Sequence, residues 1–401
     1  MAKVCIIGFG CVGSGTYEVL KQNKHLIEMR TGETVDVKYI VDIRDFSGHE
    51  VAPFVTTNFD DVLSDEEVSI VIETMGGTSF AYDYTKRALE SGKNVVTSNK
   101  ELVALKGDEL FALAKENGVN YFYEASVGGG IPIIRPLISS LGANKVTEIT
   151  GILNGTTNYI LTNMLKKGTS FAECLCEAQK LGYAENDPTA DVEGFDTGKK
   201  ISILSSMVVG KKVNFENVYT EGITKVSSED AHYAEALGCA IKLIGKYKDT
   251  REGAEVFVAP MFVGKESPLH HIDDVFNGIL VYGDMLGVSL FYGRGAGMLA
   301  TASAVVSDVM EIVKGAPDHS KLPWTACNEN IVKDYNDVKA RFFVRIKDSN
   351  GAMSKVINAF SGEKTIELYD GEFAVITPCI SVRELGTILG DVEIISRYMF
   401  A

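Results

Sequence analysis

The first 130 residues alternate short apolar runs with amphipathic runs. Four apolar stretches have the length of buried strands: "KVCIIGFG", "VDVKYIVDIRD", "VSIVIET" (68–74) and "NVVTS" (94–98). Between and after them, "AYDYTKRALESG" and "GDELFALAKENG" have helical spacing and end at glycine. A further strand is predicted at "NYFYEAS" (120–126). This alternation predicts an α/β fold, an open and mostly parallel sheet of the doubly wound Rossmann type.

The first predicted strand leads directly into Gly8-x-Gly10-x-x-Gly13 and then into an amphipathic helix. In such a motif the first glycine makes the tight turn and the second lets the backbone approach a pyrophosphate. The third lets helix and strand pack closely, and the free N–H groups of the helix start attract the anion. Because the motif stands between a strand and a helix, a dinucleotide site is favoured over a glycine turn without a ligand.

The second strand ends in Asp42-Ile43-Arg44. An acid at this place holds the ribose hydroxyls of NAD, whereas an arginine favours the 2′-phosphate of NADP. Both are present, so the sequence leaves the choice between NAD and NADP open. Ligands of these sheets lie beyond the strand ends, where Lys100 follows "NVVTS". A lysine there is placed for chemistry, although a loop lysine is more often merely solvated.

After residue 130 the pattern changes. A strand, a polar turn and a helix are predicted at "VTEITGILNGTTNYIL", and another helix at "FAECLCEAQKLG". The segments "GAEVFVAPMFV" and "NGILVYGDMLGVSLFYG" alternate as long strands. We expect an α+β region with an antiparallel sheet. One face would cover the nucleotide cleft and the other would pair with a second subunit.

Charge is concentrated in "GYAENDPTADVEGFDTGKK", residues 182–200. Pro188 cannot continue a helix, so "AENDPTADVEG" is predicted to be a loop, with a helix beginning near Phe195. Asp196 and Lys200 then share one helical face. The ordinary alternative is an exposed ion pair of small energy. The apolar continuation "ISILSSMVV" indicates a buried helix instead, and burial shifts a lysine pKa readily, so this pair is a candidate for proton transfer.

The last 65 residues predict a small unit of their own. Its strands and helices follow the order βαββαβ, the ferredoxin-like split unit: "ARFFVRIKD", "GAMSKVINAF", "TIELY", "EFAVITP", "SVRELGTIL" and "VEIISRYMF". The unit resembles an ACT regulatory module, which binds an amino-acid effector, although "DSNGAMS" stands where such modules usually have a Pro-Gly turn. A structural or dimerising tail is the alternative. The preceding "VKGAPDHSKLPWTACNENIVKDYND" is predicted to be a linker.

Composition narrows the class of protein. The formal net charge of -15 argues against nucleic-acid binding, which needs a basic face. Seven cysteines without a CxxC motif favour a reducing, cytoplasmic location. Because the first strand begins almost at once, no signal peptide is expected, and the absence of an apolar run of about 18 residues argues against a membrane span.

Taken together, the motifs resemble those of homoserine dehydrogenases, NAD(P)-dependent enzymes that reduce aspartate 4-semialdehyde to homoserine. The resemblance covers nearly the whole chain in order: "GFGCVG", "ETMGG", "GKNVVTSNKELVA", "EASVGGGIPII", "GILNGTTNYIL", "AQKLGYAENDPTADVEGFDTGKK" and "GRGAGMLATASAVVSDV". It argues against the nearest enzymatic rival, a diaminopimelate-type dehydrogenase on a similar plan. A rival of another class is an inactive nucleotide-binding regulator with an ACT-like sensor.

The resemblance implies roles for individual residues. Lys100 and Lys200 would be the two active-site lysines that meet the reacting oxygen, and Asp196 would work with Lys200. The substrate's amino group would be held in a pocket lined by Glu185, Asp191, Tyr183, Gly155 and Thr156. The cofactor would be bound by Gly8, Gly10, Cys11, Val12, Gly13, Asp42, Arg44, Thr74, Met75, Gly76, Ser98, Lys100 and Gly295.

A monovalent cation, usually sodium, is also implied by the resemblance. Its ligands would be Glu124 and the carbonyl groups of Val127, Gly129 and Ile131. Hard oxygen ligands suit such an ion. A glycine-rich turn without an ion is the competing interpretation of this segment.

The expected organisation has three parts. A dinucleotide-binding domain spans 1–130, with a helix at 297–315 packing back on it. A substrate-binding and dimerisation domain spans 131–296, and an ACT-like module spans 338–401. We expect a homodimer or homotetramer without nucleic-acid or membrane partners.

Overall fold

The computed structural model describes residues 1–315, 323–349, 351–360 and 365–401. These residues divide into two compact units, each treated separately below. Unit 1 comprises Met1–Lys145, Ser202–Phe215 and Phe291–Glu329, and unit 2 comprises Val146–Ile201, Glu216–Leu290 and Asn330–Ala401. The three-part division expected from the sequence remains a prediction. The expected linker and the turn "DSNGAMS" lie partly outside the described residues.

Unit 1 contains one sheet in which the strands pair in the order β3-β2-β1-β4-β5-β6, every neighbouring pair being parallel. This is the Rossmann order, and it confirms the predicted fold class. The strands are β1 (Ala2–Ile7), β2 (Val35–Val41), β3 (Val55–Thr56), β4 (Val68–Glu73), β5 (Asn94–Thr97) and β6 (Tyr121–Phe122).

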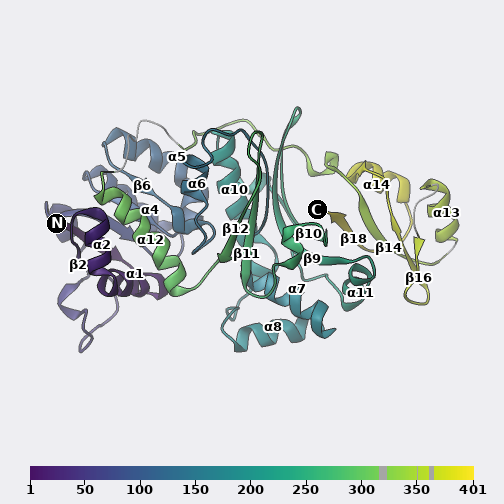
Figure 1. The fold of residues 1–401 in the computed structure, drawn as a ribbon, viewed down its shortest axis with the longest axis horizontal. Helices are drawn as coiled ribbons and strands as arrows, with labels where there is room; N and C mark the ends of the chain where they lie inside the picture. The colour runs from purple at the N-terminus through teal and green to yellow at the C-terminus, as the bar shows by residue number, and fades with distance from the viewer. Residues whose placement is uncertain (316–322, 350, 361–364) are drawn as a thin grey trace. The chain divides into compact units, whose positions relative to one another are not determined.

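The helices of unit 1 come from two distant parts of the chain. They are α1 (Cys11–Gln22), α2 (Lys24–Thr31), α3 (Phe59–Ser64), α4 (Ser79–Glu90), α5 (Lys100–Glu116), α6 (Ile134–Ile138) and α12 (Met298–Val313). Although α12 is distant in sequence, it lies beside α1 and α2 (Figure 1), and its Val305 and Val309 share one buried cluster with Leu20 and Ile27. The late helix therefore completes the core of the nucleotide-binding unit.

The strand expected at 120–126 is shorter than predicted. Strand β6 ends at Phe122, and a 3₁₀ turn, η2 (Glu124–Ser126), follows it. The physical reason is the buried Glu124 carboxylate, which turns toward the backbone N–H groups of Ile133 and Ile134. The chain has to leave the strand direction for this contact to form.

Unit 2 is built on a long mixed sheet in the order β12-β11-β7-β9-β10-β18-β14-β16-β15, with β8 also pairing to β10. The sheet confirms the α+β region, and β7, β9, β10 and β11 pair antiparallel as expected. The strands outside the C-terminal module are β7 (Val146–Ile152), β8 (Tyr219–Thr220), β9 (Cys239–Thr250), β10 (Gly253–Gly264), β11 (Phe276–Gly283) and β12 (Gly287–Arg294), the last of which crosses into unit 1.

The helices of this region are α7 (Gly155–Lys167), α8 (Phe171–Lys180), α9 (Thr189–Val192), α10 (Phe195–Val209) and α11 (Ser228–Ala236), and the 3₁₀ turns are η3 (Phe215–Asn217), η4 (Pro268–His271) and η5 (Tyr335–Asp337). Helix α10 begins at Phe195 as predicted. The prediction of an uninterrupted loop before it was wrong, because α9 forms one helical turn. Pro188 lacks an N–H, but its carbonyl accepts from the N–H groups of Asp191 and Val192.

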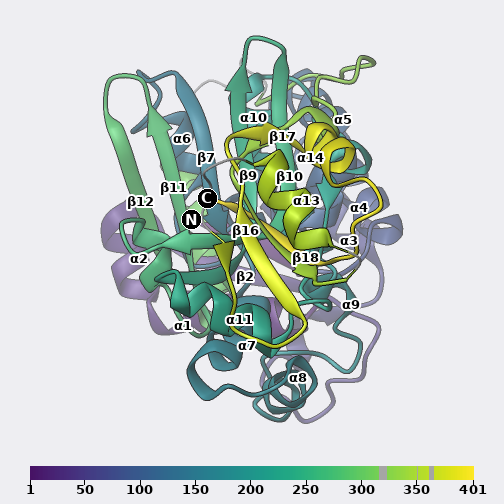
Figure 2. The same cartoon turned by 90° about the vertical axis from the view of Figure 1, so that its right-hand side faces the viewer.

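The C-terminal module consists of β14 (Phe342–Lys347), α13 (Ala352–Ala359), β15 (Thr365–Ile366), β16 (Glu372–Ile376), α14 (Val382–Leu389) and β18 (Ile394–Phe400), with a small pair formed by β13 (Lys339–Ala340) and β17 (Ile380–Ser381). Its antiparallel order β18-β14-β16-β15 confirms the ferredoxin-like topology. The module is the yellow and yellow-green ribbon in Figure 2. Both helices pack on one face, where Val356 and Leu385 contact the same buried cluster. Strand β18 also pairs with β10, so the module continues the sheet of unit 2.

No helix among the described residues is long and apolar enough to cross a membrane.

Candidate active site

The three motif glycines of unit 1 occupy distinct environments. Gly8 has a φ of +83°, a left-handed conformation that favours glycine. A Cβ on Gly13 would lie 2.0 Å from the Gly8 carbonyl oxygen, so the helix passes too close to the turn for any side chain. A Cβ on Gly10, in contrast, would meet nothing within 4 Å. The turn is therefore closely packed between Gly8 and Gly13 and open at Gly10. On the open side Cys11 and Val12 begin α1, and a pyrophosphate can approach their N–H groups.

The end of β2 carries a closed ion pair. The Asp42 carboxylate accepts hydrogen bonds from Arg44 Nη2 at 2.7 Å and Nε at 3.0 Å, and from the Phe9 N–H at 2.7 Å. The Arg44 guanidinium lies over the Phe46 ring, 5.3 Å from its centroid. The arginine donors hold the pKa of Asp42 well below its usual range. Asp42 is buried and Arg44 is exposed. The two side chains expected to distinguish NAD from NADP are therefore paired with each other.

The neighbouring strand ends position the other expected cofactor residues. The Thr74 hydroxyl donates to the Gly8 carbonyl oxygen at 2.6 Å, which ties the β4 end to the glycine turn. Met75 and Gly76 continue this loop, and Ser98 follows β5. Lys100 is the first residue of α5 and is half-buried. A helix start carries a partial positive charge, so a lysine at this place adds to a concentration of positive potential.

In unit 2, Lys200 and Asp196 form a buried ion pair on one face of α10, as predicted. Their Nζ and Oδ2 atoms lie 2.7 Å apart, and Lys200 is 8% and Asp196 5% exposed. The Lys200 ammonium also donates to the Leu153 carbonyl oxygen at 2.8 Å. The lysine is therefore held from two directions by a carboxylate and a backbone carbonyl.

Asn154 links this pair to a second carboxylate. Its side-chain amide donates to Asp191 Oδ1 at 2.7 Å and to Asp196 Oδ2 at 2.8 Å. Burial raises the pKa of Asp191, and the nearby negative charge of Asp196 raises it further. Because Asn154 Oδ1 accepts from the Thr157 N–H at the start of α7, the amide is fixed in orientation. The expected residues did not include Asn154; its place between strand and helix in "ILNGTT" was the available signal.

Two more of the expected substrate residues meet in unit 2. The Thr156 hydroxyl donates to the Tyr183 carbonyl oxygen at 2.6 Å, which joins the start of α7 to the 182–184 loop. Gly155 admits no side chain, because a Cβ there would lie 2.7 Å from the Val275 carbonyl oxygen. Glu185 is exposed, and its backbone carbonyl accepts from Gln179 Nε2 at 3.1 Å. The structure brings Thr156 and Tyr183 together and leaves the Glu185 side chain in solvent.

The glycine-rich segment proposed to bind a cation lies in unit 1. The Glu124 carboxylate accepts from three consecutive N–H groups, those of Ile133, Ile134 and Arg135, at 2.7–2.8 Å. These donors open α6, so the carboxylate stabilises the start of that helix. Gly129 has a φ of +54°, and a Cβ on it would lie 2.4 Å from the Gly295 carbonyl oxygen. The two glycine-rich loops, at 127–131 and 293–297, are therefore in direct contact.

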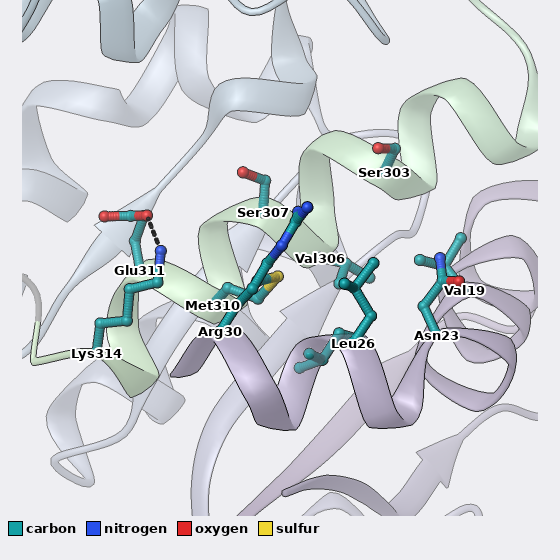
Figure 3. A pocket seen from close by; sticks show the side chains of 11 residues that line it. Val19, Asn23, Leu26, Arg30, Ser303, Val306, Ser307, Met310, Glu311 and Lys314 are labelled. Atoms are coloured by element: carbon teal, nitrogen blue, oxygen red, sulfur yellow. Dashed lines mark hydrogen bonds and ion pairs between the residues drawn. The ribbon is translucent and has the colours of Figure 1, made fainter. Parts of the chain in front are cut away.

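Two surface cavities lie away from all of these residues. One, of about 270 Å³, lies between α2 and α12 (Figure 3) and is lined by side chains that include Leu26, Arg30 and Met310. The other, of about 360 Å³, lies in unit 2 beside β18. Neither contains any residue expected to bind substrate or cofactor.

Comparison with known proteins identifies the family. Residues 8–124 match the model described as "Homoserine dehydrogenase, NAD binding domain", and residues 132–310 match the "Homoserine dehydrogenase" model. The homoserine dehydrogenase of Pseudomonas aeruginosa is 39% identical, over 90% of this chain and 85% of that protein. That of Bacillus subtilis is 36% identical over 98% of this chain and 96% of that protein. The chain belongs to the homoserine dehydrogenase family.

The fold agrees over the full length. The crystal structure of a homoserine dehydrogenase from Thiobacillus denitrificans matches with a TM-score of 0.91 and 34% identity, covering 100% of this chain and 98% of that one. Homoserine dehydrogenases are NAD(P)-dependent oxidoreductases that interconvert homoserine and aspartate 4-semialdehyde in amino-acid biosynthesis, and this chain is one of them. The expected recognition, enzyme class and function are thereby confirmed.

Proposed function

We propose that Lys200 meets the reacting oxygen of the substrate. The observation that carries this is its hydrogen bonding. An ammonium has three protons, and among the described residues Lys200 has two acceptors, Asp196 and the Leu153 carbonyl. The third proton remains for a substrate oxygen. Because the two fixed acceptors determine the direction of that proton, the lysine is oriented before the substrate binds.

Proton transfer from Lys200 accompanies the hydride transfer. When the aldehyde is reduced, negative charge develops on its oxygen, and the Lys200 ammonium stabilises it and transfers its proton. The neutral amine left beside Asp196 regains a proton from water. In the oxidation of homoserine the same amine takes the hydroxyl proton. The nicotinamide of NAD(P), when bound, supplies or accepts the hydride. We assign Lys100 a second positive charge for the same oxygen.

The substrate's ammonium group is assigned to the carboxylates before α10. Asp191 lies within the same hydrogen-bonded group as Asp196; burial raises the pKa of Asp191, and repulsion from Asp196 raises it further. A bound ammonium would relieve this repulsion. We place Asp191 and Glu185 around that group, with Gly155, Thr156 and Tyr183 forming the adjacent wall.

A sodium ion fits the 124–131 segment through carbonyl oxygens. Among the described residues no backbone N–H group donates to the carbonyls of Val127, Gly129 or Ile131, and such oxygens are suitable ligands for a hard cation. Since the Glu124 carboxylate already accepts three N–H groups, we assign its contribution to its main-chain carbonyl. The ion would stabilise the contact between the two glycine-rich loops.

We also propose a homodimer in the cytoplasm. Val288, Leu290 and Tyr292 alternate along β12 and are 43–55% exposed, so one face of the edge strand presents an apolar stripe. These three side chains are uncharged, and an exposed apolar stripe on an edge strand suits a two-fold interface, although the exposed Arg294 ends the same face. The seven cysteines are all free, as expected in a reducing compartment.

The decisive experiment replaces Lys200 by alanine. We expect Lys200→Ala to lower kcat by at least about 10³-fold, while the affinity for NADPH and the melting temperature stay near the wild-type values. Turnover is measured by absorbance of the reduced nicotinamide with homoserine. The matched control is Lys199→Ala, which changes the preceding residue of α10 and is expected to keep most of the activity. Wild-type turnover in Lys200→Ala would refute the assignment, and an inactive wild-type protein would favour a nucleotide-binding regulator.

A further inference from the structure

A buried carboxylate joins two strand ends of unit 1. Glu73 is the last residue of β4 and is 0% exposed. Its Oε1 accepts from the Met75 N–H at 2.8 Å, and its Oε2 accepts from the Thr97 hydroxyl at 2.5 Å. Thr97 is the register partner of Glu73 and the last residue of β5. The carboxylate therefore holds the two loops that leave these strands.

From Thr97 the hydrogen bonds continue to the start of α5. The Thr97 hydroxyl oxygen accepts from the Asn99 N–H at 2.9 Å. Asn99 is the N-cap of α5: its Oδ1 accepts from the Leu102 N–H at 3.1 Å. Its amide also donates to the Gly77 carbonyl oxygen at 2.7 Å, on the loop that follows β4. Lys100 is the next residue after this cap, so its backbone position is determined by the network.

In the other direction the network reaches the glycine turn. Thr74, next to Glu73, donates through its hydroxyl to the Gly8 carbonyl oxygen and through its N–H to the Ile7 carbonyl oxygen at 2.9 Å. The end of β4 therefore touches both the loop that would hold the pyrophosphate and the turn that carries Lys100. No other residue type supplies two strong acceptors at one strand end as a carboxylate does.

Stability alone does not account for this residue. A fully buried carboxylate loses its hydration, and a well-packed apolar side chain of similar size usually stabilises a fold as well or better. Tyr121 on β6 is also buried; burial raises its pKa, and its phenol interacts electrostatically with Glu73. Burying the Glu73 carboxylate therefore costs folding free energy, and a functional role would explain why a carboxylate stands at this position.

We propose that Glu73 is a positioning residue that, through Thr97 and Asn99, holds Lys100 in register with the nucleotide-binding turn. The proposal rests on the role assigned above to Lys100. Glu73 itself need not touch the substrate. Its effect is to hold the start of α5, and with it the positively charged Lys100, in one position. Small displacements of a catalytic group reduce turnover strongly.

The test compares Glu73→Gln, Thr97→Val and Thr97→Ser in the full-length protein. We expect the first two to lower kcat about tenfold or more, with the Kd for NADPH and the KM for homoserine within about threefold. Thr97→Ser keeps the hydroxyl and retains kcat within about twofold. Hydrogen exchange of the peptide covering 98–105 should become faster in Glu73→Gln and Thr97→Val, and should stay slow in Thr97→Ser.

A double-mutant cycle with Lys100→Ala separates positioning from a general structural effect. If Glu73 acts through Lys100, Glu73→Gln lowers kcat in the wild-type background and has no further effect in Lys100→Ala. Additive losses, or unchanged hydrogen exchange at 98–105, would overturn the proposal. A fully active Lys100→Ala would refute the role of that lysine, while an inactive wild-type enzyme would refute the proposed function; each is a distinct result.

Discussion

At the scale of single residues, the environment of a charged group decides what it can do. Glu73 and Glu185 are both glutamates near expected ligands, yet one is fully buried and the other is exposed. Burial raises the pKa of Glu73 to about 7. The hydrogen bonds from Thr97 and Met75 act in the opposite direction and lower this pKa, but burial has the larger effect. Its charge therefore changes in the range in which enzymes work.

This shift predicts a pH dependence of stability. The folded-state pKa is raised, so the favourable contribution of neutral Glu73 is complete below about pH 4.5 and is lost as the pH rises through about 7. We expect the unfolding free energy of the wild type, minus that of Glu73→Gln, to fall by up to about 3 kcal/mol between pH 4.5 and 8. Urea unfolding at several pH values measures it. A difference that does not change with pH would contradict the prediction.

The pair of Asp42 and Arg44 predicts cofactor preference at the same scale. Arg44 is the group suited to a 2′-phosphate, and its removal leaves Asp42 to bind ribose hydroxyls. We expect Arg44→Ala to lower the ratio of kcat/KM for NADP to that for NAD about tenfold or more. Arg30→Ala on α2 is the control and leaves the ratio unchanged. An unaltered ratio in Arg44→Ala would show that this side chain does not read the phosphate.

At the scale of elements, a buried group of charged side chains connects helix α11 to strands β14 and β16. Arg345 on β14 is 7% exposed and pairs with Asp230 of α11 at 3.2 Å and with Glu372 of β16 at 2.7 Å. Asp230 also accepts from the Tyr398 hydroxyl on β18 at 2.9 Å. The module thus binds α11 through a buried charge cluster on the face opposite to its own helices.

Breaking this cluster should loosen the module. We expect Arg345→Met to lower the unfolding free energy by about 3–5 kcal/mol, because two carboxylates lose a shared buried partner. The control is Arg383→Met on α14, whose ion pairs with Asp334 and Asp337 are exposed; it should not change stability measurably. Denaturant unfolding compares the two. Equal stability of Arg345→Met and wild type would mean that apolar packing alone holds the module.

At the scale of the whole molecule, the exposed apolar side chains of β12 lead to a prediction about the oligomeric state. We expect the protein to be a dimer in solution and Val288→Glu with Leu290→Glu to make it monomeric, because like charges on both copies would be buried without partners. Light scattering after size exclusion measures the mass. Met29→Lys, which changes an exposed methionine of α2, is the control. A wild-type monomer, or a double variant that remains dimeric, would refute this interface.

Features that depend on local spacing follow from the amino-acid sequence alone. The glycine motif follows from contiguous residues, and Asp196 and Lys200 meet because a helix repeats every 3.6 residues. The strand alternation and the order βαββαβ likewise predicted both sheets, since apolar periodicity reports which side of an element is buried. Full-length likeness to homoserine dehydrogenases agrees with these motifs.

Hydrogen bonds between distant segments, in contrast, depend on the folded arrangement of the chain. Asn154 bridges Asp191 and Asp196, Glu73 meets Thr97, and the Glu124 carboxylate caps α6 instead of standing free. None of these contacts has a sequence period, because each depends on strand register and on which loops leave neighbouring strand ends. The chain therefore specifies its chemistry locally, while the orientation of each charged group is set by partners that only folding brings within hydrogen-bonding distance.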